Sequence, residues 1–408
     1  MRGLVLCGGV SQRNLIEEMK RRGIETIVAD RNENAPAVKY ADKFYPVSTM
    51  DIDGIRRVAV DEQVDFVISV CADQMLLVAA QVCQELGLPC YIDYETAKNV
   101  SNKEYMKKIF VEHDIPTAKY IVGSTFSEED IQGMQFPLVT KPVDAYSSRG
   151  VKKVETMEEL KAAFDDAVHI SRTHSAVIEE FAGGDEMSVD IYVEEGVAKI
   201  LCIRVLDKIP GSTGFIICRG RYPAPLSPEM YDKVQEVGQK IADAFGLVNT
   251  PMLIQMKVDG DKIRVIEFCA RTGGGIKYRL LPLVSGFNVV NAVLDLTLGK
   301  KPHYDGYHLD KYIVDEFLYC KPGVLDHLEG FEELLAEGVI SHYDAFKAKG
   351  HIFGEISSSG DRVAYFSVEA DTPEELERKH KLAGQRVRAI SQTGEDLIRH
   401  EIIHYEKY

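Results

Sequence analysis

The stretch VIEFCARTGGG, Val265 to Gly275, joins a β-type run to reactive side chains and a glycine loop. Side chains alternate between the two faces of a strand, so one face is expected to hold Glu267, Cys269 and Arg271. The other face is apolar and suits a core: Ile266, Phe268 and Ala270. Two interpretations are open. The stretch is either a surface strand with a salt bridge and a turn, or a strand whose polar face meets a ligand.

The chain has 408 residues, too many for one ordinary core, so two or three domains are expected. Hydrophobic residues make up 45% and charged residues 27%, which is typical of a soluble globular protein. The formal net charge of −16 argues against a general nucleic-acid binder, because such proteins neutralise phosphates with clustered Lys and Arg. The negative net charge is compatible with a small anionic ligand bound in a local basic pocket.

Neither a membrane span nor a secretory signal is expected. No apolar run reaches 18 residues, and no charged-then-apolar leader is present. The eight cysteines are scattered without a C-x-x-C pair. Several stand inside apolar runs, which predicts buried, reduced thiols in a cytoplasmic protein: Cys7, Cys71, Cys83 and Cys202.

The first hundred residues alternate strand and helix signals. Strands are expected at residues 2–9, 25–30 and 64–73, and helices at residues 14–23 and 74–87. This order predicts a parallel sheet whose ligand-facing loops follow the carboxyl ends of the strands. Gly8 and Gly9 could admit a phosphate there, but G-x-G-x-x-G is absent, so a dinucleotide site is not favoured.

A helix is expected next, in SNKEYMKKIFVEHDIP. Ser101 and Glu104 have the spacing of a capping box, and Pro116 would end the helix. Its apolar stripe consists of Met106, Ile109 and Phe110. Residues 119–200 then alternate short strands and helices less regularly, as in a small α+β module.

Residues 253–268 predict a β-hairpin around Asp259-Gly260-Asp261. If this three-residue loop sets the register, Gln255 lies opposite Val265 and diagonal to Glu267 on the same face. The tail after residue 300 mixes β-type pieces with a helix from Pro373, for which Thr372 is the expected N-cap.

HEIIH, His400 to His404, matches the H-E-x-x-H zinc signature. That chemistry needs both histidines on one helix face and a third ligand beyond them. Only four residues follow, and the two isoleucines favour a terminal strand, so a zinc hydrolase is not favoured.

A nucleotide site is better supported, although no Walker loop occurs. A β-type run ends at Lys141 and is followed by Ser147-Ser148-Arg149-Gly150, a loop whose N–H groups could close over a phosphate. Glu179-Glu180-Phe181 leaves another strand, and Glu186 follows two glycines. That bend could offer amides to a base and a carboxylate to ribose. Each piece has a plain alternative, a lysine at a strand end or an acidic hairpin.

The order of these pieces resembles the ATP-grasp superfamily over nearly the whole chain. The order begins with Lys103 on a capped helix and Lys141 before its loop. The segments IEEF and GDE follow, and IQMKV and VIEFCARTGGG come last. The resemblance implies an α/β and α+β chain with an ATP-grasp fold. Its expected parts are a pre-ATP-grasp parallel-sheet domain (1–98), an ATP-grasp domain (99–299) with a small lid at about 119–182, and a C-terminal α+β subdomain (300–408). The tail is similar to that of the biotin-carboxylase-like branch.

The resemblance also implies residue roles around ATP. Lys103 and Lys141 would contact the α- and β-phosphates, and the loop Ser147, Ser148, Arg149 and Gly150 would cover the γ-phosphate. The adenine contacts would come from Glu179, the backbone of Glu180 and Ala182, and the intervening Phe181. Glu186 would bind the ribose.

The implied metal is Mg²⁺, for which Mn²⁺ could substitute, held by Gln255 and Glu267. Gln255 departs from the usual Glu but resembles carbamoyl-phosphate synthetase domains. Cys269 replaces the usual Asn and is a poor magnesium ligand, so it is expected to pack instead. The residues expected near the acyl phosphate are Arg271, Lys277 and Arg279, with Arg219 and Arg221 as further candidates. Outside the strand motif, each of these basic residues could equally be a solvated surface charge.

The resemblance therefore implies a cytoplasmic, ADP-forming carboxylate–amine ligase for small molecules such as amino acids. It implies no nucleic-acid or membrane partner, and homodimers are frequent in this branch. ATP would phosphorylate a carboxylate, and an amine would attack the acyl phosphate. A stand-alone carboxylase or carbamate-forming enzyme is the enzymatic alternative, and a non-catalytic ATP-binding protein is the other. No MKM biotin-attachment segment is present.

Overall fold

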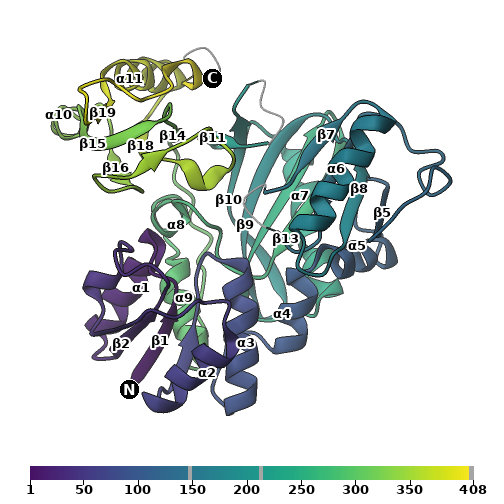
Figure 1. The fold of residues 1–408 in the computed structure, drawn as a ribbon, viewed down its shortest axis with the longest axis horizontal. Helices are drawn as coiled ribbons and strands as arrows, with labels where there is room; N and C mark the ends of the chain where they lie inside the picture. The colour runs from purple at the N-terminus through teal and green to yellow at the C-terminus, as the bar shows by residue number, and fades with distance from the viewer. Residues whose placement is uncertain (146–148, 211–214, 404–408) are drawn as a thin grey trace.

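The computed structural model describes residues 1–145, 149–210 and 215–403, apart from the side chain of Asp73. Within these residues the strands form four sheets, and the α/β and α+β architecture predicted from the sequence is confirmed. Figure 1 shows the N-terminal part, the central large sheet, a smaller sheet beside it and the C-terminal part at the opposite end of the large sheet.

The N-terminal part is built on a parallel sheet in the order β3-β2-β1-β4. Its strands are β1 (Arg2–Leu6), β2 (Glu25–Ala29), β3 (Lys43–Tyr45) and β4 (Phe66–Ile68). Its helices are α1 (Val10–Arg21), η1 (Val38–Tyr40), α2 (Ile52–Asp61) and α3 (Asp73–Leu86). The strands and helices predicted here are confirmed, with shorter strands than expected. β3, η1 and α2 carried no clear sequence signal.

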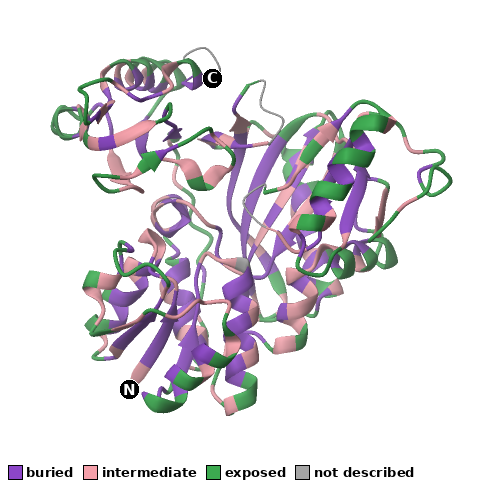
Figure 2. Ribbon diagram, in the orientation of Figure 1, coloured by how far each residue is buried: buried purple, intermediate pink, exposed green. Residues whose placement is uncertain are grey.

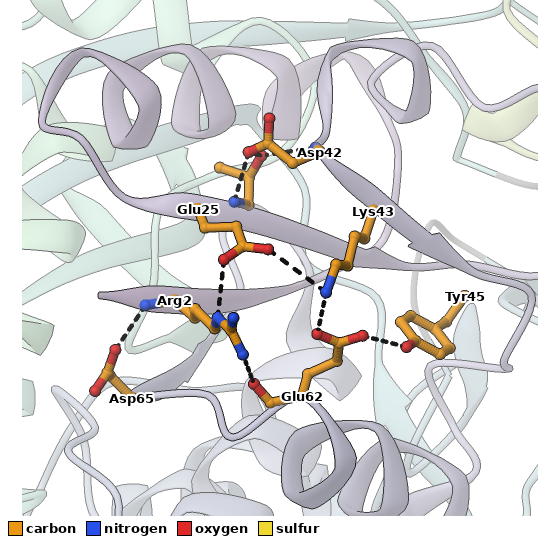
Figure 3. A network of polar contacts seen from close by, with 8 residues as sticks. Arg2, Glu25, Asp42, Lys43, Tyr45, Glu62 and Asp65 are labelled. Atoms are coloured by element: carbon orange, nitrogen blue, oxygen red, sulfur yellow. Dashed lines mark hydrogen bonds and ion pairs between the residues drawn. The ribbon is translucent and has the colours of Figure 1, made fainter.

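A polar network holds together the starts of these strands (Figure 3). Arg2 Nε lies 2.8 Å from Glu25 Oε2, and Lys43 Nζ lies 2.6 Å from Glu62 Oε2. Asp65, just before β4, accepts a hydrogen bond from the backbone N–H of Arg2. These charges are therefore used at the amino edge of the sheet. The carboxyl edge, where parallel sheets bind ligands, faces the rest of the molecule.

A smaller antiparallel sheet in the order β5-β8-β6-β7 occupies the predicted lid region. Its strands are β5 (Tyr120–Gly123), β6 (Leu138–Pro142), β7 (Lys152–Val154) and β8 (Ala176–Glu180). Helix α6 (Met157–Ile170) begins where the side chain of Thr156 accepts from the N–H of Glu159. Leu160 and Phe164 of α6 pack on the sheet in a separate small core, so this unit is held together by its own apolar contacts.

The large sheet is antiparallel, in the order β13-β12-β9-β10-β11-β14-β18-β16. Its strands are β9 (Asp185–Glu194), β10 (Val197–Lys208), β11 (Ile217–Tyr222), β12 (Thr250–Asp259), β13 (Lys262–Cys269), β14 (Tyr312–Leu318), β16 (His342–Ala345) and β18 (Ala364–Ala370). The helices beside it are α4 (Tyr94–Ser101), α5 (Lys103–Glu112), α7 (Pro228–Ala244), α8 (Lys277–Ser285) and α9 (Val289–Thr297). Figure 2 shows its central strands buried along most of their length. The sheet crosses the boundary proposed at residue 300, and the three domain ranges stay a prediction.

The β12–β13 hairpin is confirmed, but its predicted register is wrong. The loop has two residues, because Asp259 pairs with Lys262, and a bulge shifts the ladder between Gln255 and Met256. Gln255 therefore lies directly opposite Glu267, not opposite Val265. The bulge also removes Ile266 from the core, where we expected it.

The N-cap predicted at Ser101 is also wrong. Ser101 is the last residue of α4, and Asn102 caps α5 by accepting a hydrogen bond from the N–H of Glu104 at 2.8 Å. The short Asn side chain can satisfy this first-turn donor as well as Ser. The helix and its apolar face are confirmed, with Met106 and Phe110 buried.

The C-terminal part adds a small sheet in the order β17-β15-β19. Its elements are β15 (Gly323–Glu329), α10 (Phe331–Ala336), β17 (Ile352–Phe353), η2 (Ser359–Asp361), α11 (Pro373–Arg386), β19 (Arg388–Ser391) and η3 (His400–Ile402). Thr372 caps α11 as predicted. The terminal strand expected for HEIIH is wrong, because His400 begins the short helix η3, and His404 lies outside the described residues.

One hydrophobic core joins the N-terminal part to the large sheet through α8 and α9: it includes Val5, Ile68, Val293, Leu201 and Phe317. All eight cysteines are free thiols, and Cys83 and Cys202 are buried as predicted, whereas Cys7 and Cys71 are only partly buried. Among the described helices none is by itself long and apolar enough to cross a membrane. α8 and α9 reach that length and composition only together and are bent by 101°.

Candidate functional site

Two adjoining pockets, which share part of their lining, lie at the large sheet. The first lies between the β5-β8-β6-β7 sheet and the β12–β13 hairpin, and the second lies between the large sheet, the N-terminal helices and the C-terminal part. Four residues line both: Lys103, Ala145, Gln255 and Glu267. The second cavity has a volume of about 340 Å³, the size of a small-molecule site. A group bound in one pocket can therefore reach the other across this shared set.

Glu179 ties β8 to α5 and β6 at the wall of the first pocket. Its Oε1 lies 2.5 Å from Lys141 Nζ, and its Oε2 lies 2.8 Å from Lys107 Nζ. Burial alone would raise the pKa of Glu179, but the two ammonium groups outweigh it and lower that pKa to about 2. Burial lowers the pKa of Lys107. One carboxylate thus contacts two lysines at this wall.

Lys103 and Glu267 face each other where the pockets join. Lys103 Nζ lies 3.1 Å from Glu267 Oε2 and donates to the carbonyl of Ala145 at 3.0 Å. The cross-strand pairing brings Gln255 opposite Glu267. An amide oxygen and a carboxylate are hard ligands that suit Mg²⁺.

Cys269 takes no part in this oxygen pair. It is buried, lines only the second pocket, and its Sγ lies 3.8 Å from the carbonyl of Leu253. Its packing role was expected. The described residues contain no group of three His, Cys, Asp or Glu that could hold a metal ion. A metal at the junction would therefore need ligand oxygens in addition to the side chains of Gln255 and Glu267.

The segment after β8 brings the remaining predicted nucleotide residues to the first pocket: Glu180, Phe181, Ala182 and Glu186. The N–H of Glu180 already donates to the carbonyl of Lys119 at 3.0 Å, so it is occupied by the fold. Phe181 packs 6.2 Å from Phe215, ring centre to ring centre. Together these rings give the pocket an apolar wall.

Glu186 lies between two lysines from neighbouring strands. Its Oε1 lies 2.5 Å from Lys208 Nζ and its Oε2 lies 3.8 Å from Lys257 Nζ. Burial lowers the pKa of Lys257. The carboxylate is thus held in the wall of the pocket, where a hydroxyl group could donate to it.

The predicted phosphate loop is only partly described. Ser147 and Ser148 lie outside the described residues. Arg149 lines the first pocket. Gly150 does not line it, and its φ of +75° with Ile170 Cδ1 only 2.8 Å from the place of a Cβ explains why glycine stands there.

The second pocket is rich in cations. Arg271 lines it and donates to the carbonyl of Thr272 at 2.6 Å. Lys277 also lines it but is buried, forms an ion pair with Asp190 and donates to Ser188 Oγ at 2.9 Å. Burial lowers the pKa of Lys277. Lys277 thus lines the pocket with its charge paired to Asp190, and its catalytic role stays a prediction.

The other predicted helpers line neither pocket. Arg279 turns to the C-terminal part, where it lies 3.2 Å from Glu369. Arg219 is completely buried and lies 2.6 Å from Glu316. Arg221 lies 2.9 Å from Asp207. We therefore withdraw these three arginines from the site, because their guanidinium groups hold carboxylates elsewhere in the fold.

Several cationic residues at the site escaped the sequence analysis. They include Lys107, which contacts Glu179, Lys208, Lys257 and Arg264 of the first pocket, and Arg204 and Arg362 of the second. Lys107 sits one turn after Lys103 on α5, and that spacing could have indicated it. Arg204 interrupts the apolar run of β10, lines the second pocket and lies 2.9 Å from Asp315. Arg362 comes from the C-terminal part, and no local pattern points to it.

Three families match separate parts of the chain. Residues 4–89 match the PylC-like N-terminal domain, residues 134–279 the ATP-grasp domain, and residues 316–390 the L-amino acid ligase C-terminal domain 2. The chain is 24% identical over 319 residues to a formate-dependent phosphoribosylglycinamide formyltransferase of Methanocaldococcus jannaschii, covering 74% of this chain and 78% of that one. It is 25% identical over 257 residues to the enzyme of that name from Pseudomonas fluorescens, covering 60% and 62%.

Solved structures share the whole fold. An L-amino acid ligase from Bacillus licheniformis superposes with a TM-score of 0.82 at 20% identity, covering 96% of this chain and 98% of that one. The biotin carboxylase domain of Hydrogenobacter thermophilus 2-oxoglutarate carboxylase gives 0.78 at 16% identity, covering 95% and 90%. A phosphoribosylglycinamide synthetase from Anaerococcus prevotii gives 0.73 at 18% identity, covering 96% and 99%.

Proposed function

Since the chain belongs to the ATP-grasp superfamily, we propose that it is an ATP-dependent carboxylate–amine ligase that forms an amide bond and releases ADP and phosphate. One observation carries the proposal: two pockets meet at Lys103, Gln255 and Glu267. ATP would lie in the first pocket and the carboxylate in the second. The phosphoryl group then has to travel only across the shared set.

The lining of the first pocket offers a contact for each part of a nucleotide. The apolar wall around Phe181 would take the base, and the buried carboxylate of Glu186 would accept from a ribose hydroxyl. Lys103 and Lys141 stand at the end where the phosphates would lie, as fixed cations on the developing charge. Glu179 holds Lys141 in place and reduces the cost of burying it.

The side chains at the junction fit magnesium. Glu267 supplies a carboxylate and Gln255 an amide oxygen, and the lysine 3.1 Å away marks a place where a cation is favourable. The bound ion would neutralise charge on the phosphates of ATP. Mn²⁺ takes oxygen ligands as well and should substitute.

The chemistry needs two displacements. An oxygen of the substrate carboxylate attacks the γ-phosphorus, and the bond to the β-phosphate oxygen breaks, which releases ADP. The amine nitrogen then attacks the acyl carbon, the bond to the phosphate oxygen breaks, and the nitrogen loses a proton. Arg271, beyond Glu267 on the same chain segment, would contact the acyl phosphate in both steps.

Amino acids are the substrates we favour, because residues 316–390 match the L-amino acid ligase C-terminal domain 2. That part of the chain reaches the second pocket through Phe317 and Arg362. We further propose a cytoplasmic location, in keeping with eight free thiols. A homodimer remains a prediction.

The test is a screen for phosphate release. The purified protein is incubated with Mg²⁺-ATP and pairs of amino acids or small amines, and products are identified by mass. We expect phosphate release that needs both a carboxylate and an amine. Release that needs only bicarbonate would favour the carboxylase alternative, and ATP binding without release under any pair would contradict the ligase.

A further inference from the structure

Arg362 brings a guanidinium from the C-terminal part into the second pocket. On the basis of the ligase function proposed above, we infer that Arg362 binds the carboxylate of the amine substrate. The enzyme would then require an amino acid as its nucleophile and would discriminate against simple amines.

The guanidinium is held in a fixed orientation. Its carbon lies 3.8 Å from the ring centre of Phe317. Nε donates to the hydroxyl of Tyr319 at 3.1 Å, and Nη2 donates to the carbonyl of Ile217 at 3.1 Å. Tyr319 itself donates to the same carbonyl at 2.8 Å. Stacking and two hydrogen bonds preorganise the group, so less rotational freedom is lost when it meets an anion.

The charge of Arg362 is not balanced within the described part of the chain, where no carboxylate lies within ion-pair distance of it. The neighbouring carboxylate of Asp361 accepts from the N–H groups of Ser357 and Ser358 instead. Arg204 and Lys277, in the same pocket, are each paired with an aspartate. A half-buried guanidinium stacked on a ring and without a carboxylate is a natural partner for an anionic substrate group.

Arg362 also points to where the nucleophile would lie. Its Nη1 lies 3.8 Å from the place of a Cβ on Gly275, the last glycine of the loop that follows Arg271. Gly275 has a φ of +68°, which favours glycine, and this turn brings the loop after Arg271 close to the guanidinium. The phosphates would lie at residues that line both pockets, whereas Arg362 lines only the second. The arginine is therefore on the acceptor side, where the amine has to enter.

Arg362 contacts Phe317 and Ile217, and the same pocket is also lined by Leu206, so apolar surface is available beside the guanidinium. An amino acid could thus set its carboxylate on the guanidinium and an apolar side chain on these residues. Its amino group would remain directed at the acyl phosphate. A simple amine would gain only the apolar contacts.

The experiment measures kcat and KM for paired nucleophiles with one accepted carboxylate and Mg²⁺-ATP. The pairs are L-alanine with ethylamine and L-leucine with 3-methylbutylamine, which differ only in the carboxylate. The wild type should prefer the amino acid. Arg362→Met should raise its KM about 10- to 100-fold, the effect of losing charge-assisted hydrogen bonds, with kcat nearly unchanged. The values for the amines should not move.

Two further variants complete the test. Arg362→Lys keeps a charge without the fork and should recover only part of the KM effect. Arg13→Met is the matched control, because Arg13 is a half-buried arginine that lies 3.9 Å from Asp344 of the C-terminal part and lines neither pocket. It should behave as wild type. MgADP binding, measured by calorimetry, reports that each variant is folded.

Two results would overturn the inference while leaving the ligase intact. One is a wild type that uses the amines as well as the amino acids. The other is an Arg362→Met variant that lowers kcat equally for both members of a pair with unchanged KM, because Arg362 would then serve the acyl phosphate. A wild type that releases no phosphate with any pair contradicts the proposed function instead.

Discussion

Lys141 Nζ lies 2.5 Å from Oε1 of Glu179, and both side chains are almost completely buried. The pair joins β6 to β8 at the wall of the first pocket, and Lys107 reaches the other oxygen of the same carboxylate from α5. One acidic group therefore fixes the position of two cations. This arrangement makes the wall a site for phosphate and also part of the fold.

Lys141→Met should weaken ATP binding about 10- to 100-fold, because a desolvated phosphate would lose a charge-assisted hydrogen bond. Turnover should be largely lost. Calorimetry of MgATP binding measures the effect. Lys119→Met is the control, since Lys119 is exposed and its Nζ donates to the carbonyl of Gly133 instead. Equal ATP affinity in the Lys141 variant and the wild type would contradict the phosphate assignment.

Glu179 should make stability depend on pH in acid. Its pKa is about 2 in the folded protein, below the ordinary value of 4.5, so the unfolded chain binds the proton more readily. The free energy of unfolding should therefore fall as the pH falls from about 4.5 toward 2, and this contribution is complete above 4.5. Urea unfolding at a series of pH values measures the slope.

Glu179→Gln should reduce that slope, although it also lowers stability at neutral pH because two buried lysines lose their partner. Glu180→Gln changes a neighbouring carboxylate that is not placed between lysines and should keep the wild-type slope. If both variants show the same pH dependence as the wild type, Glu179 is not the group that titrates.

Glu267→Gln should leave a folded protein that needs much more Mg²⁺ for turnover, because it removes the charged ligand of the proposed oxygen pair. Titration of activity with Mg²⁺ at saturating ATP measures this. Cys269→Ala is the comparison, and we expect no shift in its magnesium requirement. A shift in the cysteine variant and none in Glu267→Gln would place the metal elsewhere.

Arg271→Ala should bind ATP nearly normally and lose about 100- to 1,000-fold in kcat, the usual loss when one preorganised donor to developing charge is removed. Arg271→Lys should not restore the rate, since a point charge cannot replace the bidentate fork. Rapid-quench measurement of acyl phosphate formation shows which step is slowed. Full turnover in the alanine variant would leave Arg271 a structural residue.

Lys277→Met should lower the free energy of unfolding by about 3–5 kcal/mol, because it leaves Asp190 as an uncompensated buried charge. The double variant Lys277→Met with Asp190→Leu should recover most of that stability. If Lys277 acts only as a wall residue, turnover should return with the stability. A stable but inactive double variant would show that Lys277 contacts the substrate.

Much of the site could be predicted because its residues stand at the ends of strands that are recognisable from short sequence patterns. The end of β6 places Lys141, the end of β8 places Glu179 to Ala182, and the run in β13 places Glu267. Strand periodicity and helix caps act over a few residues and are visible in the sequence. The predicted register of the β12–β13 hairpin was wrong because β13 carries a bulge, in which one extra residue interrupts the pairing. The alternation of polar and apolar residues does not reveal the position of such a bulge.

By itself, the sequence determined the parallel N-terminal sheet, the β12–β13 hairpin and part of the lining of the first pocket, including Lys141, Glu179 and Glu267. Only the tertiary structure decided which cations remain at the site. Ion pairs with Glu316 and Glu369 hold Arg219 and Arg279 away from the pockets. Arg362 is held in the second pocket by a hydrogen bond to the carbonyl of Ile217, 145 residues away in the sequence. The reason is physical. The residue pattern of a strand determines on which face a charged side chain lies, whereas the packing of distant segments determines which group that side chain contacts.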